Sequence, residues 1–256
     1  MTQPSVNVAA IVVAAGSGTR MGGVDKLFAP LAGRPLLAHT LAAFQECPAV
    51  TRVVLVLSPA SLERGRKLVR DCGFDKVSQV CVGGSRRQDS VRLGLEALGP
   101  CYVVAVHDGA RPLLTSDLIV RGLDAAGETG AAVPAIPIAY TVKDAGPDGT
   151  VLRTLDRSRL WAVQTPQVFR YDLLLRAHRE AAADPSTLRL GSGQAWLRAG
   201  YTDDAAMLEA LGLPVRLFPG SSTNLKITTP DDLRLAEALL EIETRNSQVE
   251  ARPAPT

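Results

Sequence analysis

The stretch VNVAAIVVAAGSGTRMG, residues 6–22, decides the fold of this chain. Its first half, Val6 to Val13, is an apolar and β-branched run with the length of one buried strand. Its second half brings two glycines, Gly16 and Gly18, and then a cation, Arg20. A buried strand that runs directly into such a loop is typical of an open α/β sheet, in which ligands bind beyond the carboxyl ends of the strands.

Three more strands of this kind are expected at Arg52 to Leu57, Val77 to Val82 and Tyr102 to Val106. Each is followed by a segment with helical periodicity, and this alternation predicts a mainly parallel sheet with helices on both faces. Ser85 and Gln88 have the spacing of a capping box, which predicts that a helix begins directly after the third strand of the chain.

A last helix is expected to begin at Pro230, with Thr229 as its N-cap and Asp232 in its first turn. The helical pattern ends near Thr244. We therefore expect one domain over residues 1–244 and a flexible tail over residues 245–256.

The alternation of strands and helices breaks between Ile136 and Trp161. The segment Gly146 to Gly149 has proline and glycine at the positions that a tight turn favours. We therefore expect a protruding β-hairpin arm over residues 137–160. A two-stranded hairpin is marginally stable in water by itself, so the arm is expected to pack against a second subunit.

The composition argues against several classes of protein. A chain of 256 residues, 46% of them hydrophobic, is long enough to bury the core of one large domain. The net charge is only +2, so no overall field draws the chain to nucleic acid or to a membrane surface. The four cysteines show no C-x-x-C spacing, which favours free thiols over a zinc site or a disulfide framework. No leader-like segment is apparent and no run approaches the roughly 20 apolar residues that cross a bilayer, so a cytoplasmic protein is expected.

The loop after the first strand has the composition of a triphosphate cradle. Small residues that leave room for a flat base and a phosphate chain open this loop: Ala14, Ala15, Gly16, Ser17 and Gly18. Arg20 and Lys26 then bring positive charge. The loop is not a Walker motif, because no Gly-Lys-Ser/Thr follows, and Met21 replaces the third glycine of a dinucleotide fingerprint. A bare G-x-G after a strand is more often a structural turn, and the two cations favour a binding site here.

Two further polar loops follow predicted strands at the same edge of the sheet. They are GGSRRQDS, residues 83–90, and HDGARP, residues 107–112. Asp108 suits a ribose hydroxyl or a metal, and its alternative is an Asx-turn. Each loop taken alone is as well explained as an ordinary turn with a helix cap. His107, which stands alone beside a strand end, is interpreted as a structural residue.

Five segments in this order and spacing resemble the 2-C-methyl-D-erythritol 4-phosphate cytidylyltransferase family: AAGSGTRMG with a lysine beyond it, GGSRRQDS, VHDGARP, DR with TPQ, and NLKIT. The resemblance covers Val8 to Leu240. It implies a Rossmann-like nucleotide-diphospho-sugar transferase fold and a homodimer that exchanges its hairpin arm. It also implies transfer of a cytidylyl group from CTP to methylerythritol phosphate, with Mg2+ held mainly by the triphosphate and no metal ligand assigned to the protein.

The resemblance further implies roles for individual residues. The expected nucleotide-binding residues are Ala14, Ala15, Gly16, Ser17, Gly18, Gly84, Ser85, Ser90, Asp108 and Gly109. The expected catalytic residues, which stabilise the α-phosphate or position the acceptor phosphate, are Arg20, Lys26, Arg157 and Lys226. The expected substrate-binding residues are Arg111, Thr141, Arg157, Thr165 and Lys226. Thr141 is expected to line the site of the partner subunit.

Three positions depart from the usual pattern of the family. Gly109 stands where alanine is common, Asp25 where proline is frequent, and Tyr140 where an aspartate is often present. The first two changes are expected to be tolerated. Tyr140 removes a carboxylate from the neighbourhood of the sugar, which bears on how the acceptor hydroxyls are held.

Other activities stay open from the sequence alone. A ribitol 5-phosphate cytidylyltransferase shares much of the motif set and differs mainly in the acceptor pocket. Another sugar-phosphate nucleotidyltransferase or a guanylyltransferase would differ in the nucleotide that it consumes. A catalytically silent nucleotide-binding regulator is a further alternative, because a fold does not fix a function, and the intact set of catalytic cations argues against it.

Overall fold

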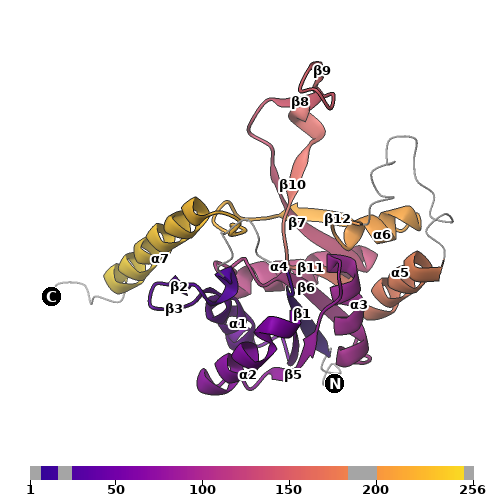
Figure 1. Cartoon of the computed structure of the whole chain (residues 1–256). Coiled ribbons are helices and arrows are strands. Elements are labelled where there is room, and N and C mark those ends of the chain that lie inside the picture. The colour runs from indigo at the N-terminus through magenta and orange to yellow at the C-terminus, as the bar shows by residue number, and fades with distance from the viewer. Residues whose placement is uncertain (1–6, 17–24, 184–200, 251–256) are drawn as a thin grey trace.

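The structure of the chain, a computed structural model, describes residues 7–16, 25–183 and 201–250. The strands of its central sheet are β1 (Val8–Ala14), β4 (Arg52–Leu57), β5 (Val77–Val82), β6 (Val103–Asp108), β7 (Ala131–Pro137), β10 (Trp161–Val163), β11 (Gln167–Arg170) and β12 (Arg216–Pro219). They lie in the order β10-β7-β11-β6-β1-β4-β5, and β12 also pairs with β7. Figure 1 shows helices on both sides of this sheet and a hairpin that projects from it.

The parallel half of the sheet carries the polar loops. β1 pairs with β4 and β6, and β4 pairs with β5, all in parallel. The four strands predicted from the sequence are therefore confirmed, although β1 begins at Val8 and extends to Ala14, and β6 begins at Val103 and extends to Asp108. Val6, where the first strand was expected to begin, lies outside the described residues. Successive side chains of β1 point to opposite faces: Ala10 and Val12 join one hydrophobic core, and Ala9 and Ile11 join the other. Because these strands are parallel, the loops after β1, β5 and β6 leave the sheet at the same edge.

Helices cover both faces of the sheet, as expected. Those that contribute to the first core are α1 (Leu36–Glu46), α2 (Leu62–Asp71) and α4 (Ser116–Thr129). Those that contribute to the second core are α3 (Arg87–Leu98), α5 (Tyr171–Ala183) and α6 (Ala205–Ala210). Phe44 of α1 and Phe169 of β11 are both fully buried, and burial of one such side chain stabilises the fold by about 1.5–3 kcal/mol. The α/β class is therefore confirmed.

The other half of the sheet is largely antiparallel, which the sequence analysis did not predict. β11 is antiparallel to β6 and β7, β10 is antiparallel to β7, and β12 is parallel to β7. Short elements complete the fold: η2 (Lys26–Phe28), β2 (Pro30–Leu31), β3 (Arg34–Pro35), η3 (Pro59–Ser61) and η4 (Arg157–Arg159). β10 and β11 have only three and four residues, and the longer β7 contains two prolines, so these strands lack the sequence pattern of the parallel strands.

The predicted capping box of Ser85 and Gln88 is wrong. Helix α3 begins at Arg87, and Arg86 is its N-cap. The carboxylate of Asp89 accepts the N–H of Arg86 at 3.2 Å and pairs with its guanidinium at 2.8 Å. Gln88 instead accepts the N–H of Tyr201 at 2.8 Å. A charged acceptor one residue later therefore caps this helix in place of the amide.

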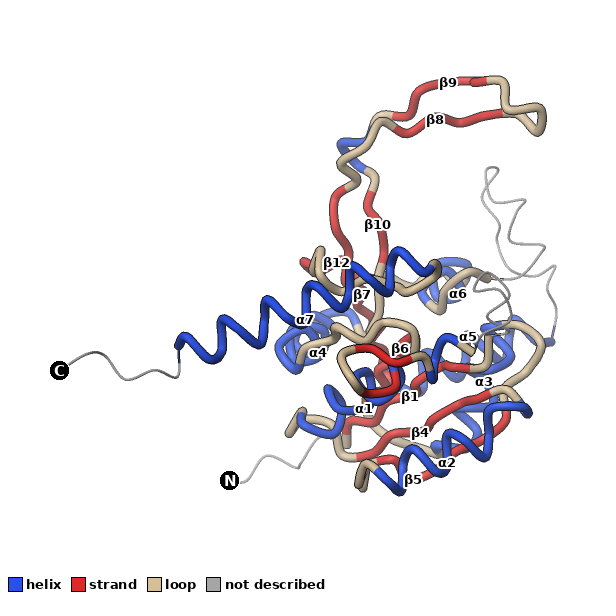
Figure 2. The backbone as a smooth tube through the Cα atoms, turned by 60° about the vertical axis from the view of Figure 1, so that its left-hand side comes forward, coloured by secondary structure: helices blue, strands red, loops and turns tan. Residues whose placement is uncertain are grey.

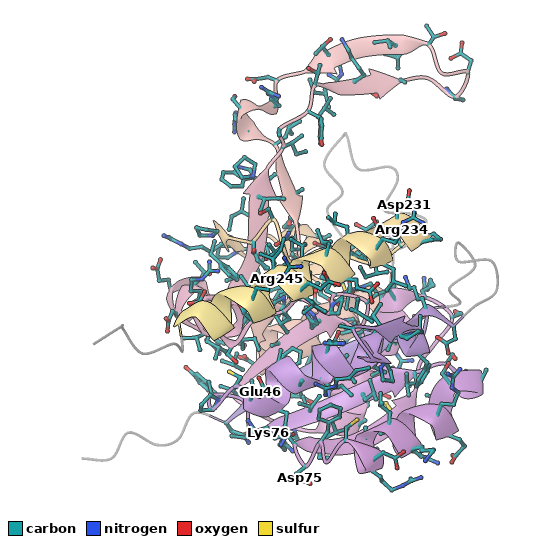
Figure 3. All side chains as sticks on the ribbon, turned by 90° about the vertical axis from the view of Figure 1, so that its left-hand side faces the viewer. Glu46, Asp75, Lys76, Asp231, Arg234 and Arg245 are labelled. Carbon is teal, nitrogen blue, oxygen red and sulfur yellow. The ribbon has the colours of Figure 1, made fainter. Side chains whose placement is uncertain are left out.

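Helix α7 (Pro230–Glu250) begins as predicted and ends later than predicted. The Thr229 hydroxyl accepts the N–H of Asp232 at 3.2 Å, and the Asp232 carboxylate accepts the N–H of Thr229 at 2.8 Å. Residues 245–250, expected to be a flexible tail, continue the helix, and Arg245 pairs with Glu241 one turn earlier at 3.6 Å. Figure 3 shows this helix in yellow, with Asp231 and Arg234 at its start and Arg245 further along. In the described ranges, α7 included, no helix is both long and apolar enough to cross a membrane.

The expected hairpin arm is present. Its strands β8 (Val142–Ala145) and β9 (Val151–Leu155) pair with each other in an antiparallel sheet of their own. Gly149, in the predicted turn, has a φ of +81°, a conformation that glycine adopts at little cost. The arm stands away from the central sheet in both Figure 1 and Figure 2. The strands of the hairpin therefore lie outside the central sheet.

Candidate active site

Asp108, the last residue of β6, lies among three cations. Lys226 Nζ is 2.7 Å from its Oδ2 atom, Arg87 Nε is 3.2 Å from its Oδ1 atom, and Arg111 Nε is 3.8 Å from Oδ2. Burial by itself raises the pKa of Asp108, but the three cations outweigh burial and hold this pKa well below its usual range. The carboxylate therefore stays ionised near neutral pH and acts only as a hydrogen-bond acceptor.

Lys26 joins the same cluster. Its Nζ atom donates to the carbonyl oxygen of Ile227 at 2.8 Å, and Ile227 follows directly after Lys226. The N–H of Ile227 in turn donates to the carbonyl of Ala110 in the loop after β6, also at 2.8 Å. The segment that contains Lys226 therefore connects Lys26 to Asp108: Lys26 binds the backbone of Ile227, and the neighbouring Lys226 binds the Asp108 carboxylate.

Asp25 holds the turn that carries Lys26. Its Oδ1 atom accepts the N–H of Leu27 at 3.3 Å, and its Oδ2 atom accepts the buried hydroxyl of Ser61 at 2.7 Å. Phe28 belongs to the same turn, and the guanidinium carbon of Arg64 lies 4.2 Å from the centroid of its ring. The turn is therefore fixed by a carboxylate that is bound to Ser61, after β4.

The loops after β1 and β5 approach each other at Gly83. A Cβ atom on Gly83 would lie 2.5 Å from the Cβ of Ala15 and 2.7 Å from Oγ of Ser90. Ser90 is buried, and its hydroxyl accepts the N–H of Gly84 at 3.1 Å and donates to the carbonyl of Arg86 at 3.2 Å. The Ser85 hydroxyl donates to Asp89 at 3.2 Å. The buried Ser90 side chain therefore stabilises the conformation of the loop after β5. Gly83 was not among the predicted residues, although it begins the GGSRRQDS motif.

Ala14 and Gly109 bring the loops after β1 and β6 together. The N–H of Gly109 donates to the carbonyl of Val13 at 2.8 Å, and a Cβ atom on Gly109 would lie 2.9 Å from the Cβ of Ala14. The backbones are therefore closer here than two side chains normally allow. Gly16 is exposed and open, since nothing lies within 4 Å of a Cβ placed on it. Ser17, Gly18 and Arg20 lie outside the described residues.

A chain of hydrogen bonds through His107 and Thr165 holds the backbone of Asp108 in place. Burial lowers the pKa of His107 to about 3, so this ring is neutral, which confirms the structural interpretation. The Nε2–H of His107 donates to the carbonyl of Arg111 at 3.3 Å. The other ring nitrogen, Nδ1, then carries no hydrogen and accepts the hydroxyl of Thr165 at 2.9 Å. The Thr165 oxygen accepts the N–H of Asp108 at 3.1 Å. Thr165 is thus placed to hold Asp108, and its hydroxyl is already used within the protein rather than presented to a substrate.

Arg111 is also largely buried. Its Nη1 donates to the carbonyl of Asn224 at 2.7 Å, and the Asn224 side-chain amide donates to the carbonyl of Thr165 at 2.8 Å. Burial lowers the pKa of Arg111, and the charge of Asp108 opposes this shift. Arg111 therefore lies beside Asp108, at the base of the predicted substrate site.

Two predicted residues, Thr141 and Arg157, lie on the arm. Both are exposed, and the Arg157 guanidinium donates to the carbonyl of Ala139, a residue of the arm itself. Figure 2 shows the arm extending away from the strands that carry the polar loops. Within one chain, the structure does not bring these two residues to Asp108 and Lys26.

The described residues do not offer a Mg2+ site of their own. No group of three or more His, Cys, Asp or Glu side chains in the described ranges is arranged to hold a metal. Asp108, the carboxylate at the centre of the site, already has Lys226, Arg87 and Arg111 around it, and these cations would repel a divalent ion. No step of the chemistry is therefore assigned to a protein-bound metal.

Glycine-rich and cationic loops at the carboxyl edge of a parallel sheet are typical of the nucleotide-binding α/β proteins. The model of the family described as IspD, 2-C-methyl-D-erythritol 4-phosphate cytidylyltransferase, matches residues 8–242. The chain belongs to this family.

Individual relatives agree with this assignment. The chain is 48% identical to the 2-C-methyl-D-erythritol 4-phosphate cytidylyltransferase of Dehalococcoides mccartyi strain CBDB1, over 91% of this chain and 96% of that protein. It is also 48% identical to the protein of the same name from Symbiobacterium thermophilum, over 94% and 95% of the two chains. The crystal structure of the enzyme of that name from Thermus thermophilus superposes with a TM-score of 0.71 at 35% identity, over 90% of this chain and 98% of that one.

Proposed function

We propose that this chain transfers the cytidylyl group of CTP to 2-C-methyl-D-erythritol 4-phosphate, giving 4-diphosphocytidyl-2-C-methyl-D-erythritol and pyrophosphate. The observation that carries the proposal is the hydrogen bond from Lys26 to the carbonyl of Ile227, the residue directly after the Lys226 that pairs with the ionised Asp108, at the edge where the loops after β1, β5 and β6 converge. The family match over residues 8–242 supports this acceptor and does not favour ribitol 5-phosphate.

The chemistry is a direct displacement. An oxygen of the acceptor phosphate forms a bond to the α-phosphorus of CTP, the bond from that phosphorus to the bridging oxygen breaks, and pyrophosphate leaves with the electron pair. The nucleophile is already an anion near neutral pH, so no general base is needed, and positioning and charge stabilisation provide the catalysis. The cations of the candidate active site can provide both the positioning and the charge stabilisation.

Each cation has a place in this displacement. Lys26, together with Arg20, stabilises the negative charge that spreads over the α-phosphate oxygens in the transition state. Lys226 supplies a point charge for the acceptor phosphate, and the planar guanidinium of Arg157 binds the same phosphate through two hydrogen bonds. Asp108 accepts hydrogen bonds from the ribose hydroxyls. Mg2+ enters with the triphosphate, whose oxygens are the ligands that this ion prefers.

The proposal includes a homodimer in the cytoplasm. The arm carries apolar side chains in water, with Tyr140 83% exposed and Leu152 66% exposed, and a second subunit would cover them. An arm that crosses to the partner would also bring Thr141 and Arg157 to the partner's Asp108. The four cysteines are free thiols, which suits a reducing compartment.

Pyrophosphate release tests the proposed substrates. Assayed with CTP or UTP and with methylerythritol phosphate or ribitol 5-phosphate, the protein is expected to release pyrophosphate efficiently only with CTP and methylerythritol phosphate. CTP is preferred because acceptors in the loop of Gly84 and Ser85 can bind the exocyclic amine that uracil lacks. Equal efficiency with UTP would contradict the base assignment, and equal efficiency with ribitol 5-phosphate would contradict the acceptor.

Gly83→Ala is expected to raise the KM for CTP about tenfold or more, and to lower the free energy of unfolding by about 1–3 kcal/mol. The added methyl group meets Ala15 Cβ at 2.5 Å and Ser90 Oγ at 2.7 Å, so the two loops that bind the base must separate. Gly127→Ala in α4 is the matched control, because nothing lies within 4 Å of its added Cβ. An unchanged KM in the Gly83 variant would show that the convergence of these loops does not form the base site.

A further inference from the structure

Arg87 connects Asp108 to a second carboxylate, that of Asp204. Its Nε atom lies 3.2 Å from Oδ1 of Asp108, and its Nη1 atom lies 2.7 Å from Oδ2 of Asp204. The Asp204 side chain is 0% exposed and that of Arg87 is 20% exposed. Burial lowers the pKa of Arg87, but the two carboxylates outweigh burial and keep this pKa above its usual value. The guanidinium is therefore charged, and it bridges the two carboxylates.

Asp204 is a fixed anchor for this bridge. The side-chain oxygen of Gln167, in β11, accepts the N–H groups of Asp204 at 3.1 Å and of Ala205 at 3.3 Å. The Gln167 amide donates to Asp203 at 2.8 Å, and Nε2 of His178 lies 3.4 Å from Oδ1 of Asp204. The turn that carries Asp204 is thus held by three hydrogen bonds to Gln167 of β11, outside the loops that bind the nucleotide.

Without Arg87, the positive charges would be distributed unevenly around the two oxygens of the Asp108 carboxylate. Lys226 and Arg111 both approach its Oδ2 atom, whereas Arg87 approaches Oδ1 from the other side of the carboxylate. Removal of Arg87 would leave the carboxylate free to turn toward the two cations on Oδ2. A lysine at this position would keep one charge, but it lacks the planar fork that spans two carboxylates.

We propose that Arg87 is a positioning residue, which transmits the fixed position of Asp204 to the Asp108 carboxylate and so orients it toward the ribose hydroxyls of CTP. This inference rests on the ribose contact assigned to Asp108 in the proposed function. It adds Arg87 and Asp204 to the residues on which nucleotide binding depends.

The test compares CTP with 2′,3′-dideoxy-CTP in Arg87→Lys and in Asp108→Asn. Arg87→Lys is expected to raise the KM for CTP about tenfold, since a hydrogen bond to a charged group has this order of effect, and to leave kcat nearly unchanged. The KM for the dideoxy nucleotide is expected to stay at the wild-type value, because that nucleotide lacks the hydroxyls that Asp108 binds. Arg92→Lys, an exposed position of the same helix paired with Glu96, is the control and should change neither KM.

Each outcome bears on the inference. A KM that rises equally for both nucleotides in Arg87→Lys, with a ribose-dependent rise in Asp108→Asn, overturns the role of Arg87 alone. An equal rise for both nucleotides in Asp108→Asn overturns the ribose contact, and the role of Arg87 with it. If Arg87→Lys does not fold, Asp204→Asn carries the same test, because it keeps the shape of the anchor and removes its charge. Asp204→Asn is expected to raise the KM for CTP several-fold and that for the dideoxy nucleotide not at all, and the absence of this difference would overturn the inference.

Discussion

Lys26→Ala is expected to lower turnover by ~10²–10³-fold while the KM for CTP changes little, which is the usual cost of losing one electrostatic contact to a transition state. The ammonium interacts most strongly with negative charge that is present only as the α-phosphate is transferred, so its loss affects kcat rather than ground-state binding. The structure supports this role, because the carbonyl of Ile227 holds Nζ beside Lys226, and Asp25 fixes the turn.

Lys67→Ala is the matched control for this variant. Lys67 lies on the surface of α2, where it pairs with Asp71 at 2.7 Å, and its removal should alter neither kcat nor KM. Wild-type turnover with only a raised KM in Lys26→Ala would show that this lysine binds the nucleotide without stabilising the transition state.

The parallel half of the fold was predictable from the sequence because its strands are rich in apolar and β-branched residues. β4 and β5 begin and end at the predicted residues. The antiparallel half was not predictable, since β10 and β11 are short and take their places by pairing with β7. The start of α3 was predicted wrongly because sequence spacing did not reveal that the Asp89 carboxylate, rather than the Gln88 amide, would reach the backbone of Arg86.

The candidate site was predicted mainly through the family resemblance. Pattern alone gave the glycines and cations of the first loop and left Lys226 and Arg157 indistinguishable from surface charges. Neither pattern nor resemblance gave the bridge from Arg87 to Asp204, whose partners are 117 residues apart and meet only because α3 and the turn before α6 pack together. Thr165 was predicted to bind substrate, and the structure uses its hydroxyl to connect His107 with Asp108.

The catalytic cations are proposed to come from two chains. Lys26 binds the segment that carries Lys226 in the body of one subunit, and Arg157 lies on an arm whose strands, among the described residues, form a sheet of their own. If the arm crosses a two-fold axis, each active site combines Lys26 of one chain with Arg157 of the other. Lys26→Ala and Arg157→Ala homodimers should then both be nearly inactive, because every site in each of them lacks one cation.

Mixing these two variants tests the shared site most directly. After unfolding and co-refolding together, random pairing makes about half of the dimers mixed, and each mixed dimer has one site with both substitutions and one site with neither. The expected recovery is roughly one quarter of wild-type activity, if the sites act independently. If Arg157 serves its own subunit, every site in the mixture carries one substitution. No recovery, in a mixture shown by mass spectrometry to contain heterodimers, would contradict the shared site.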